Sequence, residues 1–318
     1  MAKIAYQFNI GIDVSKQKLD VSYNDKKIAV FDNTPQGFKQ LLKSITNKQN
    51  TRIVMEATGG YERPLAHFLQ DQNIAVSIVN AKRVRDFAKA LGRLAKTDEI
   101  DSHVIRLFAE TINPHCIERK SRSQQSLDSL VHRRDQLVKQ RAMEKQHLET
   151  VVNKDAERSI RRNIKFLDKE IERIENKIKE LINSNKPLKS KVERLETIKG
   201  VGAIVALTLM ADLPELGTLS NKEISALVGV APFCRDSGTM KGKRTIWGGR
   251  AQVRTILYMA ALSARNHNAP IKAFYERLIG NGKSKKTALV ACMRKLLIMA
   301  NSMIKNNQDW NPDHGKLA

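Results

Sequence analysis

The first third of the chain places short apolar runs and amphipathic stretches in an order that few folds accommodate. Two partly alternating apolar runs, residues 8–15 and 19–24, are separated by three polar residues, which is typical of a β-hairpin. Residues 26–33 can add a third strand. Thr34 and Pro35 then supply an N-cap and a first-turn proline in the expected order, so a helix is predicted to follow.

The same alternation continues to about residue 110. The predicted elements are a strand at 51–58, a helix at 61–72, a strand at 74–80 and a helical stretch at 84–110 that breaks near Gly92. Three strands, a helix, a strand, a helix, a strand and a helix form the order of an RNase H-like α/β fold. We therefore predict an α/β domain at residues 1–112.

The middle third, residues 113–188, carries a heptad pattern. Its apolar residues alternate between spacings of three and four at Ile164, Leu167, Ile171, Ile174, Ile178 and Leu181. A similar spacing upstream falls on Leu127, Leu130, Arg134, Leu137 and Arg141. Residues 153–159 are predicted as the turn between two helices. The pattern fits a helical hairpin packed on its own chain or a helix that pairs with another copy, and its regularity favours a dimerising coiled coil.

The last third, residues 189–318, is predicted to be mostly helical. The segment "IKGVG" at 198–202 lies between two apolar helical stretches and resembles the turn of a helix-hairpin-helix, where glycines let backbone amides approach a phosphate. Further helices are expected at 220–232, 252–266 and 287–304. Between the first two of these lies a glycine-rich basic loop, "APFCRDSGTMKGKRTIWGGR".

The charge of the chain points to a polyanionic partner. It holds 56 Lys and Arg against 33 Asp and Glu, a net charge of +23, and nucleic acid is the partner that such an excess favours. No apolar run reaches the roughly 20 residues of a membrane-spanning helix. Cys116, Cys234 and Cys292 lack the pair spacing of a disulfide framework or a zinc site. We expect a cytoplasmic, reduced protein with no membrane partner.

Four carboxylates stand out in the N-terminal domain: Asp13 in the first strand, Glu56 at the end of the fourth, and Asp98 with Asp101 at the start of a helix. In an RNase H-like order the helix packs over the ends of these two neighbouring strands, so the four groups should converge. Oxygen-only ligands suit Mg²⁺ or Mn²⁺, which assist phosphoryl transfer. Acids in a first helical turn also suit the helix dipole alone, but aspartate is disfavoured in a strand. Two further acids are expected on the surface, Glu62 and Asp86.

Ser237 lies in the glycine-rich basic loop. A serine in such a turn usually satisfies local backbone groups with its hydroxyl. The alternative is a hydroxyl held beside a phosphate, where it could attack phosphorus, and the loop alone leaves both interpretations open. The basic residues predicted to contact phosphate are Lys241, Lys243, Arg244, Arg250 and Arg254 in and after this loop, and Lys199, Lys283, Lys285 and Lys286 elsewhere in the last third.

Five segments in order, "GIDVSKQKLDV", "VMEATGGYERPLAHFL", "AKTDEIDSHVIRLFA", "IKGVG" and "DSGTMKGKRTIWGGR", resemble the DEDD transposases of the insertion sequence 110 family. These are bridge-RNA-guided recombinases related to pilin-gene DNA invertases. The resemblance spans essentially the whole chain. It implies that Asp13, Glu56, Asp98 and Asp101 form the catalytic, metal-binding tetrad of a RuvC-like domain, and that Ser237 is the catalytic serine of a C-terminal transposase domain.

The resemblance also implies a mechanism and partners. Ser237 Oγ would attack a phosphate polarised by the metal-bound tetrad, giving a 5′-phosphoserine link that conserves the bond energy for rejoining, although a serine hydroxyl needs activation. Tetrad and serine would come from one or two protomers joined through the coiled coil. A dimer or tetramer would hold a structured non-coding guide RNA with donor and target DNA. Base pairing would read sequence, because phosphate contacts position a protein without specifying sequence.

Three other interpretations compete with this one. The segment "GIDVS" also resembles the first phosphate loop of sugar kinases and actin-like ATPases, but their second glycine-rich motif is missing and a charge of +23 would be unusual for them. A hydrolytic RuvC-like nuclease or resolvase would use water and form no protein–DNA link. A non-catalytic nucleic-acid-binding protein would cut nothing.

Overall fold

In the computed structural model, the chain divides into two compact units, Met1–Arg119 and Lys120–Ala318. The structure describes residues 6–25, 28–92, 98–117, 121–233, 237, 242 and 244–311, without the side chains of 98–100. The helices of the middle third therefore cluster with the C-terminal helices in one unit.

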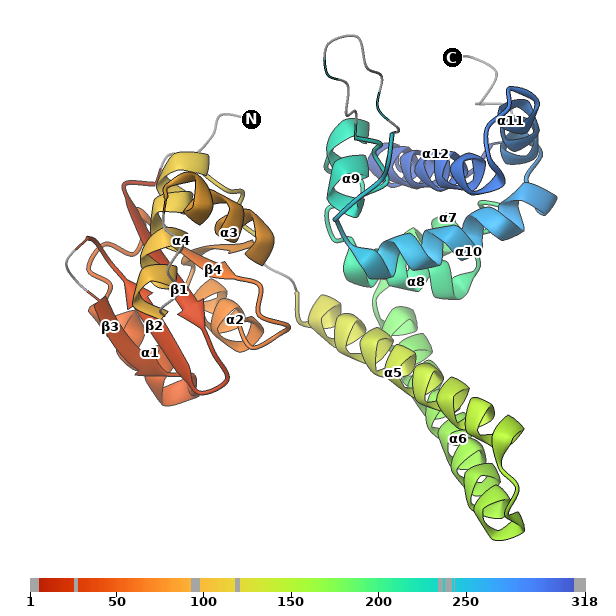
Figure 1. Ribbon diagram of the computed structural model, residues 1–318, viewed down its shortest axis with the longest axis horizontal. Coiled ribbons are helices and arrows are strands. Elements are labelled where there is room, and N and C mark those ends of the chain that lie inside the picture. The colour runs from red at the N-terminus through yellow and green to blue at the C-terminus, as the bar shows by residue number, and fades with distance from the viewer. Residues whose placement is uncertain are drawn as a thin grey trace. The chain divides into compact units, whose positions relative to one another are not determined.

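Within the described residues, the N-terminal unit forms a five-stranded sheet in the order β3-β2-β1-β4-β5 (Figure 1). Its strands are β1 Phe8–Val14, β2 Lys18–Ser22, β3 Ile28–Asp32, β4 Thr51–Glu56 and β5 Ala75–Val79. β2 pairs antiparallel with β1 and β3, whereas β4 lies parallel to both β1 and β5. The predicted hairpin is confirmed, and so is the expectation that the first and fourth strands are neighbours.

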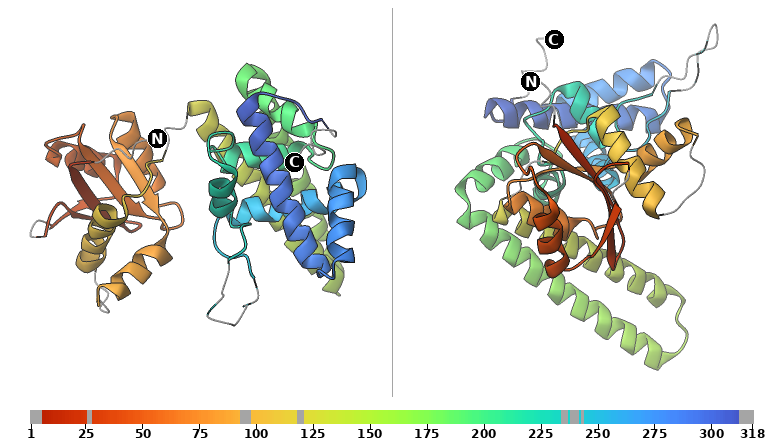
Figure 2. Two further views of the ribbon diagram at one scale, coloured as in Figure 1. Left: turned by 90° about the horizontal axis from the view of Figure 1, so that it is seen from above. Right: turned by 90° about the vertical axis from the view of Figure 1, so that its left-hand side faces the viewer.

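Helices cover both faces of this sheet (Figure 2). They are α1 Pro35–Ser44, α2 Arg63–Asp71, α3 Ala81–Ala90 and α4 Asp98–Ile112. Side chains alternate along each strand, so Ile12 packs in a cluster with α1 and α2, while Val54 packs in a second cluster with α3 and α4. Thr34 caps α1 as predicted, because its side chain accepts a hydrogen bond from the Gly37 amide.

The helical stretch predicted at 84–110 consists of two helices. α3 ends at Ala90, and Gly92 follows with φ +73°, a left-handed conformation that glycine adopts at little cost and that ends a helix. The break near Gly92 is therefore confirmed. α4 begins at Asp98, and residues 93–97 lie outside the described part of the chain.

α4 lies directly on β1 because Gly11 has no side chain. A Cβ at Gly11 would overlap the carbonyl oxygen of Ser102 and the amide nitrogen of Arg106. The Arg106 side chain is buried and forms ion pairs with Asp25 in the turn after β2 and, at 2.5 Å, with Glu110 one turn along α4. This arginine therefore ties the middle of α4 to the β-hairpin beneath it.

A second buried arginine fixes the C-terminal end of α4. Arg52 on β4 is 2% exposed and donates to Asn9 Oδ1 at 2.8 and 2.9 Å and to the Ala109 carbonyl oxygen at 2.9 Å. It also donates to Asn113 Oδ1 in the loop after α4. Burial lowers the pKa of the Arg52 guanidinium, and these oxygens compensate for its loss of water. The C-terminus of α4 therefore lies at the N-terminal ends of β1 and β4.

In the C-terminal unit, α5 (Arg122–Thr150) and α6 (Lys154–Ser184) form an antiparallel helical hairpin (Figure 1). Its turn comprises residues 151–153, so the prediction of a turn at 153–159 is wrong. The reason is Asn153, whose side chain accepts hydrogen bonds from the Asp155 and Ala156 amides and so begins α6 immediately.

The heptad residues of α6 pack within this hairpin. Leu167, Ile171, Ile174 and Ile178 are buried in one cluster with Leu127 and Leu137 of α5. The two arginines in the α5 pattern pair across the hairpin, Arg134 with Glu175 and Arg141 with Asp168, each at 2.7 Å. The chain thus fills this part of the heptad face itself, as in the alternative interpretation of the pattern. Pairing with another copy stays a prediction.

The rest of the C-terminal unit is mostly helical, as predicted, but the helix expected at 220–232 ends at Val228, because Gly229 takes the left-handed conformation that ends a helix. Its helices are α7 Lys186–Glu196, α8 Ala203–Asp212, α9 Asn221–Val228, α10 Ala251–His267, α11 Ala269–Gly280 and α12 Lys285–Asn306. α12 is the one described helix that is long and apolar enough to cross a membrane by length and composition. However, Leu289, Leu296 and Ala300 are buried in the core of the unit. α12 is therefore buried in the way that a core helix of a folded unit is.

Replacing Gly11 with alanine tests the contact between α4 and β1. We expect Gly11→Ala to cost about 1–3 kcal/mol, because the new methyl group has no space and the helix must shift. Chemical denaturation of the full chain, with hydrogen exchange to locate the loss in α4 and β1, measures it. Gly280→Ala is the matched control, since a Cβ there meets nothing within 4 Å. Equal stability of the two variants would contradict the contact.

Candidate active site and nucleic-acid contacts

A row of acidic residues crosses three strands at one end of the sheet. Asp13 on β1 pairs in register with Asp20 on β2, and the pairing of Ile12 with Met55 places Asp13 beside Glu56 on the parallel strand β4. Partners in register point to the same face, which is the face that α4 covers. Sequence reasoning missed Asp20, although the hairpin register would have revealed it once the turn length was known.

The N-terminus of α4 points toward this row. Arg52 holds the C-terminal end of α4 at the start of β1 and β4, and Ser102 lies over Gly11 in the middle of β1. The first turn of the helix therefore extends toward the strand ends that carry Asp13 and Glu56. Asp101 precedes Ser102, and its side chain is partly exposed.

The structure brings part of the predicted tetrad together. Asp13 and Glu56 are neighbours, Asp101 lies on the helix above them, and Asp98 starts that helix, with its side chain outside the described set. Among the described side chains, no three His, Cys, Asp or Glu come close enough to hold a metal ion. The convergence of all four carboxylates stays a prediction. Their donor chemistry, hard carboxylate oxygens, fits Mg²⁺ or Mn²⁺.

A buried glutamate shapes the loop that follows Glu56. Glu62 is 5% exposed, and its Oε2 accepts hydrogen bonds from the Gly60 amide at 2.9 Å, the Thr58 hydroxyl at 3.0 Å and the Thr58 amide at 3.2 Å. The prediction that Glu62 lies on the surface is therefore wrong, because the loop folds around its carboxylate. Asp86 is exposed, as predicted.

The loops after β1 and β4 are joined beside the acidic row. The Asn33 side-chain amide donates to the Ser15 carbonyl oxygen at 2.8 Å and to the Tyr61 carbonyl oxygen at 3.4 Å. The Tyr61 ring is exposed. These contacts give the carboxylate end of the sheet a defined rim.

Ser237 is exposed on the other unit, in the segment between Phe233 and Thr245. The loop closes where the Phe233 amide donates to the Thr245 carbonyl oxygen at 2.9 Å in an isolated antiparallel bridge. Arg244, beside the bridge, is exposed, whereas Lys241 and Lys243 lie outside the described residues. Ser237 is therefore at the surface of this unit.

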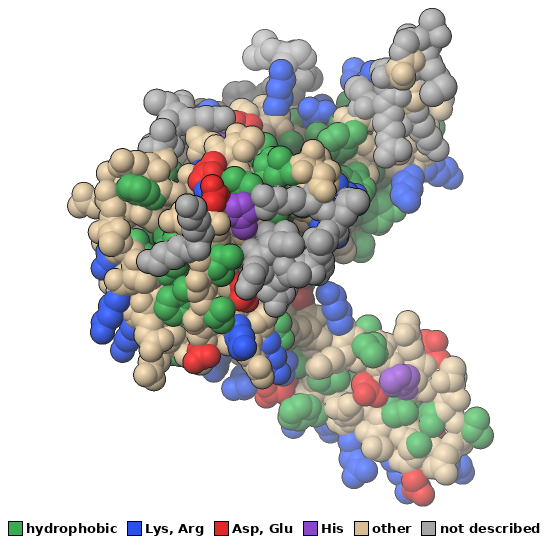
Figure 3. All heavy atoms as spheres, turned by 60° about the vertical axis from the view of Figure 1, so that its left-hand side comes forward, with side chains coloured by type: hydrophobic (Ala, Val, Ile, Leu, Met, Phe, Trp, Pro, Cys, Tyr) green, Lys and Arg blue, Asp and Glu red, His purple; other side chains and the backbone are tan. Residues whose placement is uncertain are grey.

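Two of the predicted phosphate contacts are already engaged inside the protein. Arg250 donates to both carboxylate oxygens of Glu215, at 2.5 and 2.6 Å, and to the Asp212 carbonyl oxygen at 2.7 Å. Arg254 donates to the carbonyl oxygens of Val228, at 3.1 Å, and Gly248. Four other predicted contacts are exposed at the surface: Lys199, Lys283, Lys285 and Lys286. On the face in Figure 3, Lys and Arg side chains are scattered and form no single patch.

The turn between α7 and α8 is built closely against α10. Gly200 has φ +99°, and a Cβ there would lie 2.6 Å from Ala264. The Asn268 side chain donates to the Lys199 carbonyl oxygen at 3.1 Å. At Gly202, the N-cap of α8, a Cβ would meet nothing within 4 Å. Backbone at this helix start is thus open to a partner, as a phosphate contact would require.

Both units match known transposases. Residues 10–154 match the family model of DEDD transposases of IS110 elements, described as "Transposase". Residues 192–276 match a second model, "Transposase IS116/IS110/IS902 family". The chain belongs to the insertion sequence 110 family of transposases. The first match contains the acidic row and α4, and the second contains the Ser237 loop. A transposase cuts and rejoins DNA, so family membership assigns an enzyme that rearranges DNA.

Similarity to individual family members extends over nearly the full length. The chain is 29% identical over 317 residues to the pilin gene-inverting proteins of Moraxella bovis and Moraxella lacunata, covering 95% of this chain and 97% of each relative. It is 21% identical over 291 residues to the transposase for insertion sequence element IS1111A of Coxiella burnetii, covering 81% of this chain and 78% of that protein. This transposase therefore resembles both inverting and transposing relatives across both of its units.

Replacing Glu62 tests how the transposase holds the loop beside its acidic row. Glu62→Gln should cost about 1–2 kcal/mol of local stability, because a neutral amide oxygen is a weaker acceptor than a carboxylate oxygen for the Thr58 and Gly60 donors. Hydrogen exchange at these two amides should accelerate about tenfold or more. Asp86→Asn, the same change at an exposed acid, is the control and should change neither rate. Unchanged exchange in Glu62→Gln would contradict this role.

Proposed function

We propose that the chain is an RNA-guided DNA recombinase of a bacterial insertion sequence, acting on DNA in the cytoplasm and associated with the nucleoid while it acts. The observation that carries this proposal is the pair of features that the two family matches contain. One is the acidic row, in which Asp13 and Glu56 face the N-terminus of α4. The other is Ser237, an exposed residue in a segment rich in basic residues. Carboxylates and a serine hydroxyl are the groups that metal-assisted covalent phosphoryl transfer needs.

In this proposal the N-terminal unit is a RuvC-like, RNase H-type domain. Its strand order and its carboxylates on the first and fourth strands support that assignment. Asp13, Glu56, Asp98 and Asp101 would hold Mg²⁺ or Mn²⁺. The bound ion would stabilise negative charge on the scissile phosphate. The α4 N-terminus favours the carboxylates that gather before it, and the rim at Asn33 fixes the loops around them.

Ser237 would act as the nucleophile. A bond forms between its Oγ and phosphorus, the bond from phosphorus to the 3′ oxygen breaks, and the hydroxyl proton passes to a base while the 3′ oxygen leaves as a hydroxyl. The product is a 5′-phosphoserine link, and attack by a 3′ hydroxyl on that link rejoins a strand without an external energy source. Cys292 does not compete, because it is buried and burial raises its pKa to about 11.

The remaining basic residues would hold nucleic acid by its phosphates. Lys199 lies at the α7–α8 turn, which we interpret as a helix-hairpin-helix, and three lysines lie at the start of α12: Lys283, Lys285 and Lys286. Arg244, Lys241 and Lys243 belong to the serine loop. Only 5% of residues are aromatic, so base stacking has little scope, and we assign sequence readout to a structured guide RNA paired with donor and target DNA.

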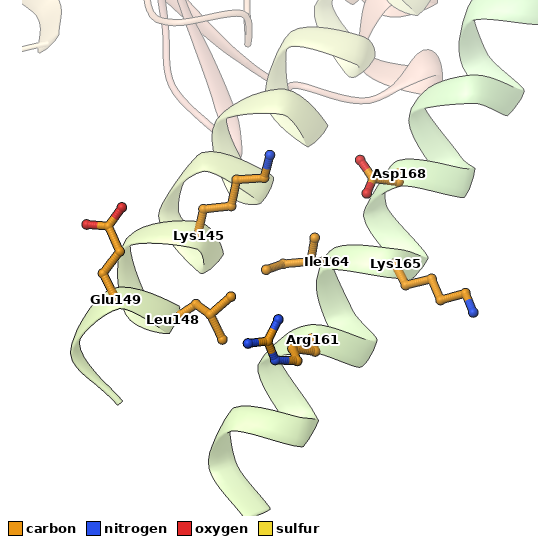
Figure 4. Close-up of a pocket in the computed structure, with 7 residues that line it drawn as sticks. All are labelled: Lys145, Leu148, Glu149, Arg161, Ile164, Lys165 and Asp168. Carbon is orange, nitrogen blue, oxygen red and sulfur yellow. The ribbon is translucent and has the colours of Figure 1, made fainter. Parts of the chain in front are cut away.

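A second copy would dock on the far end of the helical hairpin. There a groove of about 480 Å³ lies between α5 and α6, and the Leu148 and Ile164 side chains point toward one another in it (Figure 4). Its other lining residues are charged: Lys145, Glu149, Arg161, Lys165 and Asp168. Exposed apolar side chains lie near the same end, including Phe166. A groove with two facing apolar side chains and charges of both signs suits a self-complementary contact, which supports a dimer or tetramer.

The first test is the covalent link. With its element's non-coding RNA, donor and target DNA and Mg²⁺, the protein should give a protein-linked DNA band on a denaturing gel. Ser237→Ala and Asp13→Ala should abolish that band, whereas Asp86→Ala, at an exposed acid of the same unit, should retain it. Free nicked DNA that survives Ser237→Ala would show a water-using RuvC-like nuclease. Binding without any cleavage would show a non-catalytic nucleic-acid-binding protein.

Mixing two inactive variants tests whether copies share active sites. If the carboxylates of one copy serve the serine of another, equimolar Asp13→Ala and Ser237→Ala should together regain up to about a quarter to a half of wild-type linked DNA, because some mixed sites hold both intact groups. Quantifying the linked band against each variant alone measures this. A mixture as inactive as its parts would show that each copy uses its own acids and serine.

A further inference from the structure

We propose that Glu215 and Arg250, together with Arg254, are positioning residues that hold the stem of the Ser237 loop, residues 228–233 and 244–250, in place on the C-terminal unit. This inference rests on the proposed function, in which Ser237 is the nucleophile. It reassigns Arg250 and Arg254, two of the basic residues that the sequence suggests for phosphate binding. In the folded protein, their guanidinium groups bind carboxylate and carbonyl oxygens of the protein itself.

The loop emerges where two backbone segments cross without side chains. Gly229 ends α9 in the left-handed conformation, at φ +78°, and Gly249 lies against it with φ +71°. A Cβ at Gly229 would overlap the Gly248 carbonyl oxygen, and a Cβ at Gly249 would overlap the backbone of Val228 and Gly229. Beyond this crossing, the Phe233–Thr245 bridge closes the stem of the loop.

Arg254 joins the two crossing segments. From the first turn of α10, its Nη1 donates to the Val228 carbonyl oxygen on the incoming segment, at 3.1 Å, and to the Gly248 carbonyl oxygen on the outgoing one. A single planar guanidinium thus holds both sides of the stem together. Arginine suits this role because its several N–H donors have a fixed geometry.

Arg250 anchors the stem to the body of the unit. Its two terminal nitrogens each donate to one carboxylate oxygen of Glu215, at 2.5 and 2.6 Å, and one of them also donates to the Asp212 carbonyl oxygen at the end of α8. About three-tenths of each side chain is exposed, 31% for Arg250 and 27% for Glu215. A phosphate would have to displace this two-pronged pair and leave Glu215 facing a second anion. The geometry therefore favours an anchor over a phosphate contact.

Anchoring matters because nucleophilic attack depends strongly on placement. A displacement of about 1 Å can cost about a hundredfold in rate even when its cause lies away from the reacting atoms. Ser237 itself is exposed. The chain on both sides of Ser237 joins the rest of the unit through the stem, and Arg250 and Arg254 hold that stem.

The test separates positioning from phosphate binding. Under saturating DNA and guide RNA, Glu215→Gln and Arg250→Gln should each slow formation of the protein-linked DNA about 10- to 100-fold, with the double variant no slower than the worse single one. The DNA dissociation constant and its salt dependence should change less than about twofold. Exchanging the two residues, Glu215→Arg with Arg250→Glu, should recover part of the rate.

A matched control and an optical readout accompany these rates. Glu175→Gln breaks another arginine–glutamate pair, with Arg134 in the hairpin, and should leave the rate within about twofold. The chain has two tryptophans, so Trp310→Phe leaves Trp247, beside the stem, as the single reporter. In that background Glu215→Gln should lower the fluorescence anisotropy of Trp247, and Glu175→Gln should not.

Two results would overturn the proposal. One is weaker DNA binding with a shallower salt dependence in Arg250→Gln, together with tighter binding in Glu215→Gln, which identifies Arg250 as a phosphate contact. The other is unchanged Trp247 anisotropy in Glu215→Gln. The anisotropy measurement needs no DNA. It therefore shows whether the Arg250–Glu215 pair restrains the stem even if wild-type protein forms no serine link and the proposed function fails.

Discussion

The contact between α4 and β1 at Gly11 is the constraint on which the N-terminal unit depends. With no side chain at that position, a helix backbone lies against a strand backbone, and the first turn of the helix reaches the strand ends that carry Asp13 and Glu56. Arg52 and Arg106 then fix the helix at its end and its middle. Strand pairing lines up the row of acids, and the helix above it owes its place to a glycine and two arginines that carry no catalytic chemistry.

The C-terminal unit combines glycines and arginines in the same way at the stem of the serine loop. Gly229 and Gly249 let two backbone segments cross closely, and Arg254 and Arg250 bind the carbonyl and carboxylate oxygens around that crossing. In both units, close backbone contact sets the geometry and a multidentate arginine holds it. A chain of charge +23 has arginines in excess. Some of these arginines stabilise the fold. A count of basic residues therefore overstates the basic surface that is free to bind nucleic acid.

Periodicity and capping predicted most of the architecture. The strands and helices of the first third, the break near Gly92 and the cap at Thr34 follow from local rules, so they could be read from the sequence. Periodicity alone misplaces the turn of the hairpin, because the position of the turn depends on Asn153 acting as the N-cap of α6. The burial of Glu62 does not follow from periodicity either, because its donors, Thr58 and Gly60, belong to an irregular loop.

The sequence by itself determined the order of elements, the carboxylates on the first and fourth strands, the serine in its basic loop and the family of this transposase. Only the tertiary structure decided that Asp20 joins the acidic row, that the heptad face of α6 packs on α5, and that Arg250 binds Glu215. The physical reason is the distance along the chain over which each effect acts. Backbone preferences and side-chain periods act over a few residues, whereas the partner of a charged group is chosen by packing between segments far apart in the chain.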